Sequence, residues 1–177
     1  GLHIQALFYF LGLKLSARGK LRLAASQRLL SSPMDSVRYF EFDFFLRGLL
    51  FGADFQTYLD VSSPRLFPVL FLRKFSNAEA TIVNPDAKDL KITKELIAAC
   101  GLTDRCWLIR VLISDLKLPE GSFDLISSIS AIEHIPGDGD IFALEKMWRL
   151  LRPCGKLFIS VPCAREAFEE YIDYNEY

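Results

Sequence analysis

The sequence predicts an α/β fold: a doubly wound, mostly parallel sheet of about five strands, with helices before it. After residue 54, short apolar runs alternate with longer helical patterns. Between Ser122 and Pro162 the pattern is strand, polar loop, helix and strand. The connection from the helix back to the second strand is short, which favours a right-handed crossover between two parallel strands. The composition, 51% hydrophobic and 24% charged, favours a packed core over disorder.

The 177 residues are enough for one domain and a short appendage. We divide the chain into an N-terminal basic helical segment, residues 1–32, and an α/β domain, residues 33–177. No Asp or Glu precedes Asp35, whereas five Lys or Arg residues do, so the first part carries +5 and the remainder −6 of the net charge of −1. Because the first residue is Gly1 and not Met, we expect a processed piece of a longer protein.

The apolar run of residues 6–13 is far too short to span a bilayer, which takes roughly 20 residues. With the basic stretch that follows, it predicts a basic amphipathic helix. Three interpretations stay open for this helix. It packs on the domain or on a second copy of the chain, it rests on a membrane surface, or it is an organelle transit segment.

The remaining elements are justified by their apolar runs and end signals. Ser31-Ser32-Pro33 predicts a helix start, and the aromatic-rich residues 39–50 predict a helix against the sheet that ends near Gly52. The following elements are, in order, a strand Phe55–Val61, a helix from Pro64 to about Phe75, a strand Thr81–Val83, a helix Ala87–Cys100 ended by Gly101, and a strand Cys106–Leu112 leading to Asp115.

The last unit begins with a strand that contains Asp124 near its start. A helix is predicted over 141–151, with Pro153 and Gly155 ending it. Residues 157–161 predict a strand buried on both faces, and a last helix is expected from Ala164.

The cysteines, Cys100, Cys106, Cys154 and Cys163, show neither a CxxC motif nor a histidine at ligand spacing. This spacing argues against a disulfide framework and against a metal site. We interpret all four as buried thiols of a protein in a reducing compartment, and we expect a cytoplasmic location, with the N-terminal helix allowing contact with a membrane surface.

Several motifs follow one another in the order of a known family. They are Asp115 after the third strand, Leu118-Pro119, Phe123-Asp124 in the fourth strand, Glu133-His134-Ile135, and the stretch from Arg149 to Gly155. From about Arg38 to Cys163 the chain resembles the class I S-adenosylmethionine-dependent methyltransferases, in particular the type 11 small-molecule subfamily. The resemblance implies a Rossmann-like methyltransferase fold. Cys154 replaces one glycine of the family pattern.

The resemblance also implies a cofactor, S-adenosylmethionine, and the residues that bind it. These candidates are Asp60, Ser62, Asn84, Asp86, Asp115 and Leu116. Asp60 ends the first strand as the family acid does, Asn84 stands where an acid grips the ribose hydroxyls, with Asp86 able to substitute, and Asp115 would meet the adenine amino group.

The glycine-rich turn of the family is altered here, because its glycine positions hold Ser62, Pro64 and Leu66. Glycine permits unusual φ angles and close approach of a ligand, and proline has no N–H to donate. We therefore expect a damaged backbone platform for the methionine part of the cofactor. The family also adds two strands after the one that ends here near Pro162, so this last strand would be a sheet edge that Ala164–Tyr177 or a partner chain covers.

The candidate catalytic residues are Glu133 and His134, which follow the fourth strand. His134 could act as a general base, since imidazole titrates near neutral pH, or it could be a loop residue bonded to backbone. Glu133 could orient the loop or a ligand amine. Asp124 lies at the other end of its strand and is interpreted as structural.

The sequence therefore predicts S-adenosylmethionine-dependent methyl transfer to a small-molecule acceptor, such as a lipid, a glycan or a secondary metabolite. The alternative is a methyltransferase-like domain that has lost its cofactor and serves as a scaffold or partner subunit. Hydride transfer on a nicotinamide cofactor is disfavoured because no GxGxxG turn is present. We expect no nucleic-acid partner, since no binding motif accompanies the basic segment.

Overall fold

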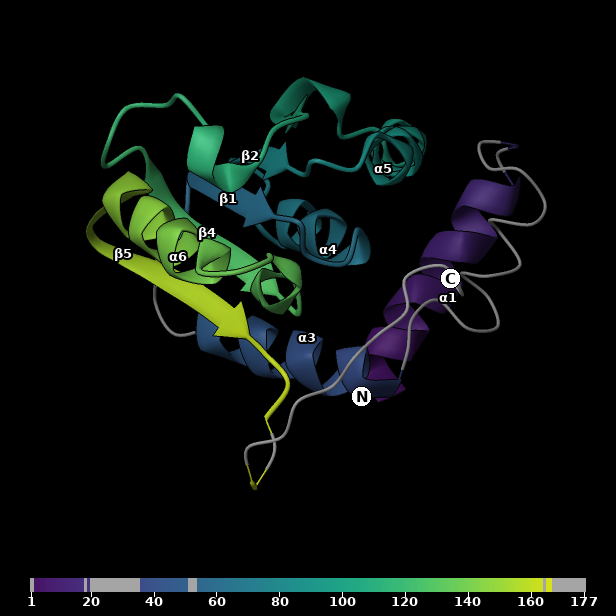
Figure 1. The fold of residues 1–177 in the computed structure, drawn as a ribbon. Helices are drawn as coiled ribbons and strands as arrows, with labels where there is room; N and C mark the ends of the chain where they lie inside the picture. Colours follow the sequence, from purple (N-terminus) through teal and green to yellow (C-terminus); the bar gives the residue numbers. More distant parts are fainter. Residues whose placement is uncertain (1, 18, 20–35, 51–53, 164, 167–177) are drawn as a thin grey trace.

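The computed structural model describes residues 2–17, 19, 36–50, 54–163 and 165–166. Its centre is a five-stranded parallel sheet with the strand order β3-β2-β1-β4-β5 (Figure 1). The strands are β1 Thr57–Val61, β2 Glu79–Val83, β3 Cys106–Ile109, β4 Phe123–Ile129 and β5 Leu151–Ser160. The predicted doubly wound fold is confirmed. The expectations for Ser31-Ser32-Pro33, Gly52 and the helix from Ala164 lie outside the described residues.

Helices cover both faces of the sheet. One face packs against α3 Ser36–Leu50, α4 Leu66–Lys74 and α5 Ala87–Cys100, and the other against α6 Gly139–Leu150 (Figure 1). Helix α1 Leu2–Ala17 lies beside α3, and its buried side chains join the same apolar cluster as those of α3. Short 3₁₀ helices are η1 Thr103–Arg105, η2 Ile113–Asp115 and η3 Ile132–His134. Two apolar cores result: the first core lies on the face covered by α3, α4 and α5, and the second core lies under α6. Successive side chains of a strand point to opposite faces, so Leu125 joins the first core and its neighbour Ile126 joins the second. The apolar strand sequences follow from this two-sided burial.

The start of β5 differs from the prediction. The helix α6 ends at Leu150, and Leu151 is already paired with Phe123 in the sheet, so Pro153 and Gly155 lie inside β5 and do not end the helix. The pairing of β5 with β4 is irregular at this point. The expectation of burial on both faces is wrong, because β5 is the edge of the described sheet and all its residues are partly or fully exposed.

One later element is shorter than predicted, and another has its predicted bounds. The strand predicted over 106–112 ends at Ile109, because its neighbour β2 ends at the paired residue Val83. The helix α5 has the predicted bounds, with Gly101 in the left-handed conformation at its C-terminal end.

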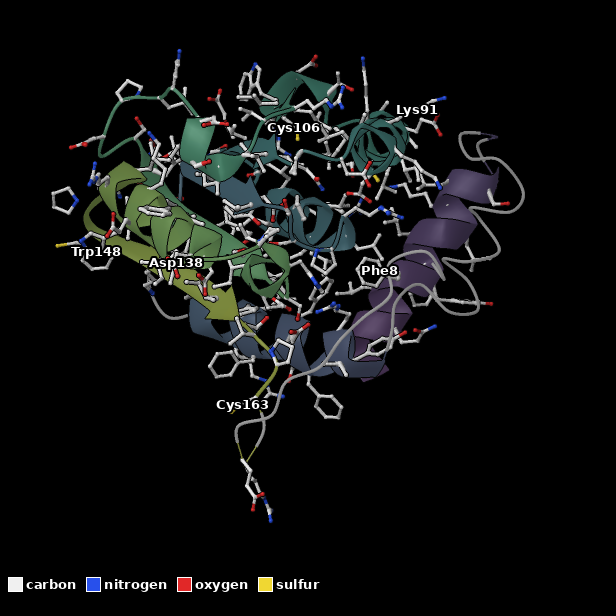
Figure 2. All side chains as sticks on the ribbon, viewed as in Figure 1. Phe8, Lys91, Cys106, Asp138, Trp148 and Cys163 are labelled. Atoms are coloured by element: carbon white, nitrogen blue, oxygen red, sulfur yellow. The ribbon has the colours of Figure 1, made fainter. Side chains whose placement is uncertain are left out.

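The N-terminal helix α1 packs on the domain through Phe8, Leu11 and Leu15, and Figure 2 shows Phe8 directed toward the core. Within residues 2–17 the prediction of an amphipathic helix is wrong, since Leu7 and Phe10 are exposed on other sides of α1, and the basic stretch that follows lies almost entirely outside the described residues. Apolar residues therefore surround the helix. No helix within the described ranges has the length and apolar character needed to cross a membrane.

The aromatic helix α3 only partly matches its prediction. Phe42 and Phe45 pack in the first core, and Phe45 stacks on Phe158 of β5 with ring centroids 5.1 Å apart. In contrast, Phe40 and Phe44 point to solvent and are 76% and 74% exposed. One face of this helix therefore covers the sheet and the other does not.

The prediction of four buried thiols is wrong for two of them. Cys106 is buried in the first core, but Cys154 and Cys163 are exposed and Cys100 is half-buried. Figure 2 labels Cys106, within the fold, and Cys163, beyond the end of β5. Cys154 lies in the irregular start of the edge strand, and Cys163 follows the end of that strand, where the described residues leave both exposed. Burial raises the pKa of Cys106 to about 12, and this thiol is therefore a poor nucleophile.

A buried carboxylate joins β1 to β4. The side chain of Asp60 has no exposed surface, and it accepts hydrogen bonds from the Tyr58 hydroxyl (2.6 Å), the Ser127 hydroxyl (3.2 Å) and the Ser63 N–H (3.1 Å). Burial raises the pKa of Asp60 to about 6, although these hydrogen bonds act to lower it.

A second carboxylate joins α3 to the carboxyl ends of β4 and β5. Glu41 Oε1 accepts hydrogen bonds from the hydroxyls of Ser130 (2.8 Å) and Ser160 (2.7 Å), and its Oε2 accepts one from Arg38 (2.7 Å). Burial acts to raise the pKa of Glu41, but the hydrogen bonds from Arg38, Ser160 and Ser130 outweigh it and hold the pKa below its usual value.

We expect Asp60→Asn to remove a pH dependence of stability. Since the pKa of Asp60 rises from 3.8 to about 6 on folding, the unfolded chain releases a proton that the folded protein keeps, and stability falls as the pH rises through this range. Relative to the variant, the wild type should lose up to roughly 3 kcal/mol of unfolding free energy between pH 4 and pH 7. Urea denaturation at several pH values measures this, and parallel curves for the two proteins would contradict it.

We expect Glu41→Gln to destabilise the protein by about 1–2 kcal/mol at pH 7, because charged hydrogen bonds to three partners are weakened. The lowered pKa gives a contribution that is present above the usual Glu value of 4.5 and lost as the pH falls through the folded-state pKa, so the difference should narrow in acid. Glu145→Gln is the matched control, since Glu145 pairs with Arg149 only at the surface. Equal melting temperatures for both variants would refute this role.

Candidate active site

The polar residues predicted from the sequence gather where the parallel strands end. In sheets of this kind, ligands bind beyond the carboxyl ends of the strands, at the point where the strand order reverses. Here β1 lies between β2 and β4, so that point lies between β1 and β4. The segments that follow the strands are residues 62–65 after β1, 84–86 after β2, 110–115 after β3 and 130–134 after β4.

The turn after β1 keeps a glycine-like backbone without a glycine. Ser62 has a φ of 54°, in the left-handed region that glycine adopts most readily. Its N–H donates to the Val83 carbonyl of β2 (2.9 Å). The Ser63 hydroxyl accepts from the Ile129 N–H of β4 (3.1 Å). The turn is therefore held from both neighbouring strands.

Leu66 and Pro64, the other two residues at glycine positions of the family turn, are buried to different extents. Leu66 is the first residue of α4, and only 7% of it is exposed because it packs in the first core beside Phe67. It points inward and does not cover the strand ends. Pro64 is half-buried, and its carbonyl accepts from the Phe67 N–H (2.8 Å), which starts the helix.

The backbone donors of this turn are nevertheless used within the protein. The Ser62 N–H is bonded to Val83 and the Ser63 N–H to Asp60, while Pro64 has none. Asp60 itself lies beneath the turn, fully buried, and holds it through Ser63. Recognition of a ligand here would depend on side chains more than on these three backbone positions.

At the end of β2, the structure connects Asn84 to two residues that the sequence reasoning missed. The Asn84 amide donates to Asp89 Oδ2 (3.0 Å), and Asp89 Oδ1 pairs with the Arg65 guanidinium from the β1 turn. Asp86 is exposed and caps α5 by accepting from the Lys88 N–H (2.7 Å). Asp89 gave no separate signal, because an acid in the first turn of a helix is explained by the helix dipole alone.

At the end of β3, the two predicted residues have different environments. Asp115 is the last residue of η2, and its exposed carboxylate has no partner among the described residues. Leu116 is 3% exposed in the second core, and its N–H donates to the Ile113 carbonyl (3.2 Å). Asp115 is therefore free to meet a ligand, while Leu116 anchors the segment.

At the end of β4, η3 carries Glu133 and His134. Glu133 Oε2 is buried and has no hydrogen-bond partner among the described residues, whereas its Oε1 lies 4.0 Å from His134 Nε2. The His134 side chain is 59% exposed. A buried oxygen left unpaired costs about 1–3 kcal/mol, so it calls for an external donor such as an N–H or O–H group of a ligand.

Glu41 is a third residue that the sequence did not single out, because it lies in an aromatic helix predicted as core. Its partner Ser130 is three residues before Glu133 and has a φ of 45°. Glu41 therefore holds the segment that leads to Glu133.

Asp124 lies at the opposite end of β4, as predicted. Its Oδ2 accepts from the N–H groups of Gln56 (2.7 Å) and Thr57 (2.9 Å), and its Oδ1 forms an ion pair with Arg152. These contacts fix the start of β1 and keep Asp124 away from the site. Among the residues that the structure describes, no group of three or more His, Cys, Asp or Glu side chains could hold a metal ion.

Comparison with known proteins adds an independent result. Residues 59–159, more than half of the chain, match the model of a methyltransferase domain family. Cycloartenol-C-24-methyltransferase of Arabidopsis thaliana is 29% identical over 116 residues, which cover 64% of this chain and 33% of the plant enzyme.

Solved structures share the fold at lower identity. A Methanococcus maripaludis protein assigned to the S-adenosyl-L-methionine-dependent methyltransferases has a TM-score of 0.60 at 19% identity, covering 71% of this chain and 56% of its own. The [4+2]-cyclase SpnF has a TM-score of 0.58 at 19% identity, covering 67% and 42%. These similarities show the fold alone.

The chain spans about a third of the plant relative and about half of the solved chains. The family model, in contrast, runs from within β1 to within β5 and includes the carboxyl ends of β1, β2, β3 and β4. The chain therefore belongs to the class I S-adenosylmethionine-dependent methyltransferase family that its sequence resembles.

Proposed function

We propose that this chain forms the cofactor-binding part of an S-adenosylmethionine-dependent methyltransferase that acts on a small-molecule acceptor. The observation that carries the proposal is the backbone of the β1 turn. Ser62 takes the glycine-like conformation, and Leu66 turns into the core. The altered turn thus keeps a shape compatible with a ligand at the strand ends, even though its glycines are gone.

The residues present fit an adenosyl group by the chemistry of their side chains. The adenosyl group offers an adenine amino group and ribose hydroxyls, and the methionine part of the cofactor offers an ammonium; all of these donate hydrogen bonds. The strand ends offer acceptors, namely the exposed carboxylate of Asp115 and the unpaired, buried Oε2 of Glu133. We assign Asp115 to adenine and Glu133 to an ammonium or hydroxyl donor, on the strength of this complementarity.

The bound cofactor would supply an electrophilic methyl group, and the chain's task would be positioning. Holding an acceptor in line with that group can contribute about 7–11 kcal/mol without covalent help from the protein. His134, whose imidazole is more than half exposed, would accept a proton from acceptors that must lose one. Glu133 lies beside it and would orient the ligand.

The acceptor is proposed only as a small molecule. The plant relative is named for carbon 24 of cycloartenol, and this supports a carbon or lipid acceptor among the small molecules to be tried first. The shared segment is a third of that enzyme.

We expect the folded protein to bind S-adenosylhomocysteine with a micromolar dissociation constant. Asp115→Asn should weaken this binding about tenfold or more, because a charged hydrogen bond is lost. Asp104→Asn is the matched control, since Asp104 is an exposed acid in η1 at the opposite end of β3 and should bind normally. Isothermal titration calorimetry measures the dissociation constants of the wild type and of both variants.

Absence of binding up to millimolar concentrations, with a folded protein, would overturn the enzyme proposal. The alternative, a scaffold that has lost its cofactor, would then be the better account of the Ser62-Ser63-Pro64 turn. Equal weakening by both variants would remove Asp115 from the site while leaving the cofactor assignment in place.

A further inference from the structure

Three side chains form a bridge across the carboxyl ends of β1 and β2. Arg65 comes from the β1 turn, Asn84 directly follows β2, and Asp89 lies in the first turn of α5. Asp89 is the centre of this bridge, because Arg65 contacts its Oδ1 and the Asn84 amide donates to its Oδ2 (3.0 Å). The bridge is not involved in the assignments of Asp115, Glu133 and His134.

The two residues first considered for ribose binding have other contacts. The amide nitrogen of Asn84 is directed to Asp89, and its Oδ1 accepts from the Asp86 N–H (2.8 Å). The Asp86 carboxylate caps α5 from an exposed position. The carboxylate next to Asn84 is therefore that of Asp89, five residues further along the chain.

Asp89 also has the capacity and the access that a diol needs. Each carboxylate oxygen has two lone-pair sites, and the bridge occupies one site on each oxygen. Its side chain is 24% exposed, so the remaining sites can be reached from solvent. The Arg65 guanidinium and the Asn84 amide fix the plane of the carboxylate, and a fixed plane suits bidentate contact with two neighbouring hydroxyls.

We propose that Asp89 binds the vicinal hydroxyls of the cofactor's ribose, and that Arg65 and Asn84 are positioning residues for its carboxylate. This inference rests on the proposed function. On this proposal, the ribose-binding carboxylate is not at the end of β2, where Asn84 stands, but in the first turn of α5, and Asn84 hydrogen-bonds to it. Without a ligand, the same bridge also joins the β1 turn to α5.

The test uses the full chain and two probes, S-adenosylhomocysteine and its 2′,3′-dideoxy analogue. The wild type should prefer the hydroxylated probe by about tenfold or more, and Asp89→Asn should reduce this preference to about threefold or less. Arg65→Gln, which leaves the carboxylate but removes one of its donors, should lower the preference in the same direction. Asp104→Asn should retain it.

The possible outcomes separate the two proposals. No binding of either probe by the folded wild type overturns the proposed function, and the Asp89 assignment with it. If the wild type binds and Asp89→Asn keeps the full preference, the Asp89 assignment is wrong while the proposed function stands. If the preference depends on Asp86→Asn instead, Asp86 is the ribose residue.

A purely structural bridge gives a different pattern. If the bridge is only structural, Asp89→Asn weakens the binding of both probes equally and lowers the melting temperature, but it leaves the preference for the hydroxylated probe unchanged. This result also overturns the assignment. If Asp89→Asn does not fold, the Arg65→Gln preference decides the matter in the same way, since an unchanged ratio contradicts a positioning role.

Discussion

The structure depends most on the buried carboxylate of Asp60 between β1 and β4. Removing a carboxylate from water is costly unless hydrogen bonds compensate, and here donors come from both strands and from the turn. Asp60 pairs with Ser127 across β1 and β4, and this places the Ser127 hydroxyl on the same face as the carboxylate to which it donates. The same contacts set the position of Ser63, so the chemistry at the strand ends rests on a polar group with no access to solvent.

The second constraint comes from the N-terminal half. Helix α3 covers β4 and β5 with aromatic rings, but its orientation is set by Glu41, which reaches hydroxyls at the ends of both strands. Its contact with Ser130 stabilises a left-handed residue directly before the segment that carries Glu133. A helix that precedes the sheet in sequence therefore fixes the segment that leads to Glu133.

The altered β1 turn offers a ligand fewer backbone N–H groups. The N–H groups of Ser62 and Ser63 are bonded inside the protein and Pro64 lacks one, so under the proposed function ligand contacts would fall to side chains such as Asp115 and Glu133. Side-chain acceptors select for donors on the ligand and are more sensitive to single substitutions than a backbone platform. The fold leaves such choices open, since methyltransferases and a cyclase share it.

The sequence by itself determined the sheet, its flanking helices, the cap at Gly101 and the end of β4 at which Glu133 and His134 lie, because apolar periodicity and strand direction are local properties. It did not determine the burial of Asp60, the exposure of Cys154, the early start of β5 or the roles of Glu41 and Asp89. Those depend on partners distant in the chain: Ser160 is 119 residues from Glu41, and Arg65 is 24 from Asp89. Local patterns carry no information on which polar groups meet across such separations, so only tertiary packing decided them.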